Sequence, residues 1–189
     1  MKFKLSFNSP IILYFTFICA CALGLNTLTN GLTNQYLFST YQSSLADPLT
    51  YFRIIAHVFG HADWNHFLGN ITLILLVGPL LEEKYGSFEI FGVIIATALI
   101  TGIVNNIFFP EIRLLGASGV AFSLILLSSF ASIQNDGEIP LTFILIALIY
   151  IMAEVVNAIT IEDNVSNITH IIGGFTGAGL GFFLRANND

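Results

Sequence analysis

Charged residues are scarce in this chain. They make up 10% of its 189 residues, and only six of them are Lys or Arg. Soluble domains carry about 25% charged residues, so a soluble globular fold is excluded. Hydrophobic residues reach 55%, which predicts an integral membrane protein. With a net charge of −6 and no basic cluster, we expect no nucleic-acid partner.

Cysteine is nearly absent, and no internal repeat is visible. The two cysteines, Cys19 and Cys21, lie two positions apart in one apolar run. On a helix they point to different faces, so they cannot easily pair, and we interpret them as small buried hydrophobic residues. No period of 20 to 50 residues recurs. The length suits a single domain covering residues 1–189.

What the chain does have is long apolar runs. A membrane-spanning helix needs about 20 mostly apolar residues. Six runs qualify: Pro10 to Leu28, Asn65 to Leu81, Ser87 to Phe108, Ala117 to Ile133, Pro140 to Ile159 and Val165 to Leu184. The first is too long for the apolar core of a signal peptide, so we expect it to be retained. The predicted fold is an all-α bundle of six transmembrane helices.

The basic residues predict how the bundle is oriented. Lys2, Lys4, Lys84 and Arg185 fall on the side of the N-terminus, and Arg53 and Arg113 on the other. The excess of positive charge predicts that both termini are cytoplasmic. The polar stretch from Thr29 to Trp64 then faces outward, and Ser118 and His170 lie near that same face.

Ser118 is a candidate nucleophile within the sequence Gly116-Ala117-Ser118-Gly119. It falls in the first turn of its predicted helix, where free backbone N–H groups and the helix dipole favour a developing negative charge. Gly116 and Gly119 allow a neighbouring helix or a substrate to approach closely. The alternative is a serine that only caps its helix.

His170 is a candidate general base. It precedes glycines at 173, 177 and 181, which form a ladder on one face of the sixth predicted helix. Such faces pack closely against neighbouring helices, so we expect the His170 ring to point into a helix contact. If the neighbour is the helix of Ser118, the imidazole can take the proton of the serine hydroxyl. The alternative is an imidazole bonded to a backbone carbonyl.

The other three histidines gather before and within the second predicted span. His66 and Asn70 are four residues apart and share a helix face, and both can donate hydrogen bonds to an oxyanion. His57 and His61 have the same spacing, which also occurs in metal sites. A metalloprotease helix would need a glutamate beside the first histidine, and Val58-Phe59-Gly60 supplies none. A metal site is therefore not expected.

These motifs resemble those of the rhomboid intramembrane serine proteases over nearly the full chain. The matches are the Gly-x-Ser-Gly sequence at 116–119, the run of His57, His61, His66 and Asn70, and the pair Phe52-Arg53. His170 with Gly173 and Gly177, Asn167 one turn earlier, and Glu82 with Gly86 also match. With six predicted spans, the chain resembles the compact, bacterial type of this family.

The resemblance implies roles for these residues. Ser118 would be the nucleophile and His170 the base of a dyad without a third carboxylate. His66, Asn70 and the Ser118 backbone N–H would hold the oxyanion. Arg53 would anchor the first loop, from Thr29 to Trp64, and Glu82 would be structural. His57, His61, Gly116, Gly119, Asn167, Gly173 and Gly177 would support the site.

Two positions depart from the family pattern. Phe52 stands where many members have tryptophan, and Phe122 where many have a tyrosine that stacks on the histidine. Phe122 can still stack, but it brings no hydroxyl group. Neither departure removes a catalytic group.

The expected function is cleavage of transmembrane segments of other membrane proteins near their outward-facing ends. No metal or cofactor is required, and the protein is expected in a bacterial plasma membrane. A first alternative is a catalytically silent rhomboid-like protein that binds or escorts membrane clients. A second is a small transporter that uses its intramembrane polar residues as a pathway, which would predict inverted repeats that the sequence does not show.

Overall fold

The computed structural model describes residues 6–131 and, further on, residues 141, 144, 145, 148, 149, 152, 171–177, 179 and 180. The labelled helices are α1 (Pro10–Leu28), α2 (Leu32–Tyr36), α3 (Pro48–Ala56), α4 (Trp64–Tyr85), α5 (Ser87–Phe108) and α6 (Ser118–Ala131), with a 3-10 turn η1 (His57–Phe59) before α4. Residues 171–177 are also helical. No strand occurs among these residues, and Thr40 and Leu114 form an isolated bridge. The described chain is therefore all-α.

Among the described residues, three helices are long and apolar enough to cross a membrane, namely α1, α4 and α5. The predicted bounds of the first and third spans agree with α1 and α5. The second span was predicted to end at Leu81, but α4 continues to Tyr85 and stops at Gly86, whose φ of 94° favours glycine. The described part of α6 is shorter, and most of the fifth and sixth predicted spans lies outside the described residues. The count of six spans stays a prediction.

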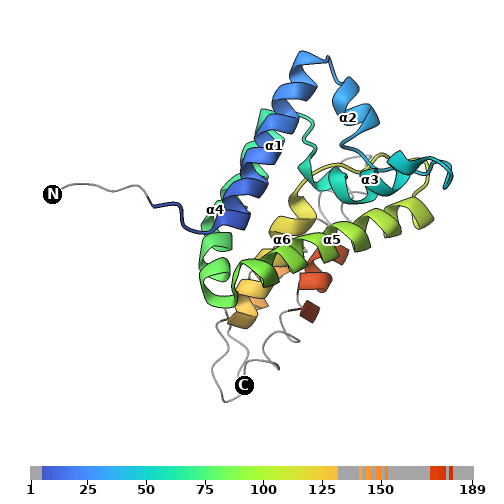
Figure 1. Cartoon of the computed structure of the whole chain (residues 1–189). Coiled ribbons are helices and arrows are strands. Elements are labelled where there is room, and N and C mark those ends of the chain that lie inside the picture. Colours follow the sequence, from blue (N-terminus) through green and yellow to red (C-terminus); the bar gives the residue numbers. More distant parts are fainter. Residues whose placement is uncertain are drawn as a thin grey trace.

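The helices pack around α6. It contacts both α4 and α5, while α1 packs on α4 and α3 packs on α5, as Figure 1 shows. Ile12, Ile74, Ile90 and Leu124 come from four different helices and are fully buried in the shared core. Their burial fixes which faces of the helices meet, because a close-packed protein interior leaves little space for alternative contacts.

The first loop is structured. The sequence indicated only a polar stretch there, but the structure has the short helices α2 and α3 and the turn η1 between α1 and α4. Asp47 begins α3, because its carboxylate accepts a hydrogen bond from the backbone N–H of Leu49 at 3.0 Å and Pro48 follows it. The loop therefore forms a folded layer at one end of the helices (Figure 1).

Candidate active site

Ser118 begins α6 and is buried, with 8% of its surface exposed. The segment before it is tied to the first loop at two points. Leu114 exchanges backbone hydrogen bonds with Thr40 at 2.9 and 3.0 Å, and the N–H of Gly116 donates to the carbonyl oxygen of His57 at 3.0 Å. The first loop thus sets where α6 begins and where the Ser118 hydroxyl lies.

Gly116 separates Ser118 from His66. Its φ of 128° is a conformation that side chains rarely allow, so glycine is required here. A Cβ atom placed on Gly116 would lie 2.8 Å from His66 Nε2 and 3.7 Å from Ser118 Oγ. A single methyl group would therefore touch both side chains. The structure brings together two residues that are 52 positions apart.

His66 and Asn70 lie one turn apart near the start of α4. Asn70 is buried, and its Nδ2 donor has no hydrogen-bond partner among the described residues. A buried amide donor without a partner costs about 1–3 kcal/mol, so this nitrogen is stabilised by any acceptor that enters the site. Together with the Nε2 edge of His66, it supplies hydrogen-bond donors at one end of α4.

His57 and His61 are both buried next to this region. The His57 ring donates from Nδ1 to the carbonyl oxygen of Ile54 at 3.0 Å, and its Nε2 lies 3.3 Å from Thr101 Oγ1. The His61 ring donates from Nδ1 to Phe59 O at 3.2 Å. Burial lowers the pKa of His57 and that of His61 to about 4 each. Both rings are neutral at pH 7, and their Nδ1 atoms are engaged with separate backbone carbonyls.

Three glycines of the C-terminal helical segment, Gly173, Gly174 and Gly177, lie directly against α6. A Cβ atom on Gly173 would lie 2.8 Å from the Cα of Gly119, and one on Gly177 would clash with the carbonyl oxygen of Ser123. Only glycine permits this approach of two backbones. Gly173 and Gly177 of the predicted face therefore pack on the helix of Ser118, and Gly181 lies outside the described residues. His170 and Asn167 lie outside the described residues.

Phe122 is the largest fully buried side chain among residues 118–129 of α6. Its ring fills the space that a side chain at Gly174 would otherwise take. Its stacking on His170 stays a prediction. Phe52, the other departure from the family pattern, is 47% exposed and its ring centroid lies 6.5 Å from that of Phe38.

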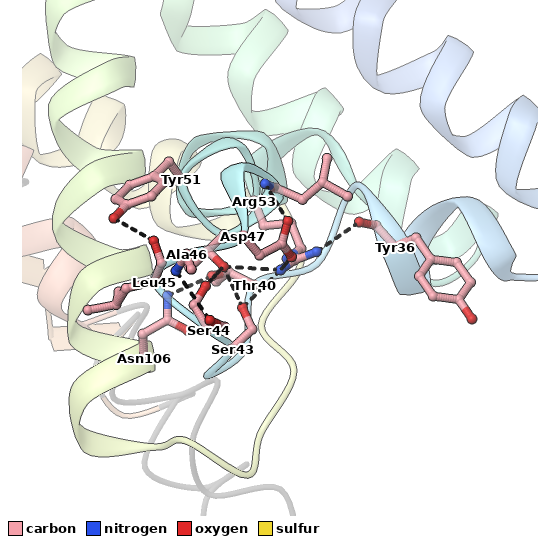
Figure 2. A network of polar contacts seen from close by, with 12 residues as sticks. Tyr36, Thr40, Ser43, Ser44, Leu45, Ala46, Asp47, Tyr51, Arg53 and Asn106 are labelled. Carbon is pink, nitrogen blue, oxygen red and sulfur yellow. Dashed lines mark hydrogen bonds and ion pairs between the residues drawn. The ribbon is translucent and has the colours of Figure 1, made fainter.

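Arg53 organises the first loop, as Figure 2 shows. Its guanidinium donates to Asp47 at 3.0 Å and to Ser43 at 2.8 Å, and it lies 4.8 Å from the centre of the Tyr41 ring. The backbone N–H of Leu49 and the Arg53 side chain lower the pKa of Asp47. Sequence reasoning missed Asp47, although an aspartate before a proline at a helix start is a usable signal.

Glu82 lies at the opposite end of α4 and is buried. Its carboxylate accepts hydrogen bonds from the backbone N–H groups of Ile11 and Ile12, each at 3.0 Å, and from the Ser87 hydroxyl at 2.7 Å. A carboxylate is favourable there because the first N–H groups of α1 have no partner within their own helix. One side chain thus joins α4 to the starts of α1 and α5.

The comparisons with known proteins all match this chain to the same family. The family model of the Rhomboid domain matches residues 48–187. The chain is 33% identical to Rhomboid-related protein 1 of Caenorhabditis elegans over 144 residues, which cover 71% of this chain and 40% of that protein. It is 27% identical to Rhomboid-related protein 2 of Mus musculus over 157 residues, covering 73% of this chain and 52% of that protein.

A further relative is Rhomboid-like protease 3 of Toxoplasma gondii, which is 26% identical over 117 residues, 62% of this chain and 43% of that protein. The matched regions span only 40% to 52% of these three relatives. The match covers the candidate active site, the glycine face that packs on α6, and two of the three apolar helices, α4 and α5. The chain is an integral membrane protein and belongs to the rhomboid family.

Proposed function

We propose that this protein is an intramembrane serine endopeptidase in which Ser118 is the nucleophile and His170 the general base. The observation that carries the proposal is the position of Gly116, which holds His66 and Ser118 beside each other at the start of α6. A serine that only capped its helix would need neither an imidazole nor the unpartnered Asn70 donor nearby.

The packing of Gly173 on Gly119 supports the role of His170. His170 lies three residues before Gly173, and Ser118 lies one residue before Gly119. We propose that this helix continues back from Gly173, which would bring residue 170 to the same face one turn earlier, toward the start of α6. In the proposal, the His170 imidazole there takes the proton of the Ser118 hydroxyl, as a serine-histidine dyad requires.

In the proposed reaction, Ser118 Oγ attacks the carbonyl carbon of the scissile peptide bond and its proton passes to His170. The carbonyl oxygen becomes an oxyanion, and it accepts hydrogen bonds from His66, Asn70 and the backbone at the start of α6. His170 then protonates the leaving amine, and an ester to Ser118 remains. Water, deprotonated by His170, hydrolyses this ester and restores the enzyme.

The proposed substrates are transmembrane segments of other membrane proteins, cut near their outward-facing ends. The carbonyl oxygens of an intact helix are already hydrogen-bonded and shielded, so the substrate must unwind locally before attack. We therefore expect small or helix-breaking residues near the cut.

The test is cleavage of a transmembrane substrate in liposomes by the wild type and by the Ser118→Ala and His170→Ala variants. Labelling of Ser118 by a fluorophosphonate provides a second readout that needs no known substrate. The proposal predicts that both variants lose cleavage and that His170→Ala loses labelling. Equal cleavage by all three proteins would refute the dyad. Binding of the substrate without cleavage by the wild type would favour a silent client-binding protein.

A further inference from the structure

The start of α4 has an unusual cap. Asp63 is the residue before the helix, with extended backbone angles of φ −153° and ψ 178°. Its carboxylate accepts a hydrogen bond from the backbone N–H of His66 at 2.9 Å. Asp63 thereby satisfies one of the backbone donors that the first turn of a helix leaves without a partner.

The side chain of His66 makes a second hydrogen bond at the start of α4. Its Nδ1 atom lies 3.5 Å from the backbone nitrogen of Ala62 and accepts a hydrogen bond from that N–H. In a capping box, the third helical residue is a glutamate or glutamine whose side chain accepts a hydrogen bond from the N–H of the N-cap residue. Here the third helical residue is a histidine, and its imidazole accepts instead from the N–H of Ala62, one residue before the N-cap Asp63.

This contact decides which nitrogen of His66 carries the proton. A nitrogen that accepts a hydrogen bond from a backbone N–H must present a lone pair. The neutral imidazole has one N–H, so the proton lies on Nε2. Nε2 is the atom that approaches Gly116, 2.8 Å from where a Cβ would stand, on the side where Ser118 Oγ lies.

A neighbouring ring limits how His66 can turn. The His61 ring meets it edge to face, with centroids 5.1 Å apart, and His61 itself packs against Phe67 at 5.4 Å. His61 is fully buried, and its Nδ1 is held by the carbonyl oxygen of Phe59. The cap and this ring contact together restrict the orientation of the imidazole.

We infer that Asp63 is a positioning residue. Its hydrogen bond from the His66 N–H, together with the hydrogen bond from the Ala62 N–H to His66 Nδ1, holds His66 as the Nε2–H tautomer facing Ser118. The catalytic use of this tautomer rests on the proposed function, because a donor at Nε2 is what an oxyanion on the substrate would need. The tautomer itself is a property of the cap and does not depend on any activity.

The experiment measures the His66 ring nitrogens by ¹⁵N NMR in the full chain, labelled at histidine and assigned with a His66→Gln variant. The wild type should show an unprotonated Nδ1 and a protonated Nε2. Asp63→Ala should give a mixture of tautomers and reduce kcat by about tenfold to a hundredfold, with little change in KM. Asp63→Asn keeps a capping side chain and should restore both the spectrum and kcat.

Asp47→Ala is the matched control, because it removes the cap of α3 in the same way and lies in another part of the first loop. It should leave the His66 spectrum unchanged. A protonated Nδ1 in the wild type overturns the inference, and this result does not require any variant to fold. An unchanged spectrum in Asp63→Ala overturns it as well. Full cleavage by Ser118→Ala would instead refute the proposed function and leave the tautomer assignment intact.

Discussion

Replacing Gly116 by alanine should damage the candidate active site, although it adds only one methyl group. The residue has φ 128°, and its added Cβ would lie 2.8 Å from His66 Nε2. Two effects therefore combine, strain in the backbone and displacement of an imidazole. The His66 ring cannot move away freely, because it contacts the Ala62 N–H and the His61 ring.

The backbone strain can be estimated. A residue with a side chain in a region reserved for glycine costs about 1–3 kcal/mol. For a chain of this size, 1 kcal/mol shifts the unfolding temperature by roughly 2–4 °C, so the expected loss is roughly 2–12 °C. Moving a catalytic donor by about 1 Å costs on the order of 10²-fold in rate. We therefore expect a loss of rate on the order of 10²-fold, together with a lowering of the unfolding temperature that leaves the protein folded.

Gly119→Ala is the matched control in the same motif. Its Cβ would meet Thr101 Cγ2 at 3.5 Å and Thr97 Cγ2 at 3.8 Å, which are ordinary contact distances. The assays are thermal unfolding in detergent and the rate of fluorophosphonate labelling of Ser118. We expect slower labelling and a lower unfolding temperature for Gly116→Ala than for Gly119→Ala. Labelling of Gly116→Ala at the wild-type rate would refute the reasoning.

Three further predictions concern stability. Glu82→Ala should lower the free energy of unfolding by about 2–5 kcal/mol, because the buried N–H groups at the start of α1 lose their acceptor. Thermal or denaturant unfolding measures this loss, and the same change at exposed Glu83 should have little effect. Gly177→Ala should lower the unfolding temperature, because its Cβ would clash with Ser123. Gly179→Ala is the control and should change the unfolding temperature little, since its Cβ would meet nothing within 4 Å. Equal effects of the two variants would contradict the packing on α6. The free energy of unfolding should fall as pH decreases from 6.5 to 4. The two buried histidines of the first loop have a pKa of about 4 in the folded protein. In the unfolded chain their pKa is about 6.5, so the unfolded state binds more protons over this range and is favoured by acid. Unfolding temperatures measured across this range check the sign, and a flat profile would contradict it.

The sequence was sufficient where a single local rule applied. The apolar runs gave the bounds of α1 and α5, because the bilayer requires about 20 apolar residues and little else. It failed at the end of α4, where charged residues indicated a loop. The helix continues there because the Glu82 carboxylate is buried against the backbone of α1, a contact across 70 residues that no local pattern contains.

The first loop shows the same limit. Its helices α2 and α3 have five and nine residues, too short for a periodic pattern to be recognised. The contacts of buried Arg53 with Ser43 and with the Tyr41 ring depend on how the chain before α3 folds back on that helix.

The sequence by itself determined that this chain belongs in a membrane, and it named Ser118, His66, Asn70 and the glycine ladder as candidates. Only the tertiary structure decided that His66 meets Ser118 across Gly116 and that Gly173 lies on Gly119. Residue types and spacing state which groups can donate, attack or approach closely. Which of them come within reach of one another depends on how the helices pack, and that is set by contacts between residues far apart in the chain.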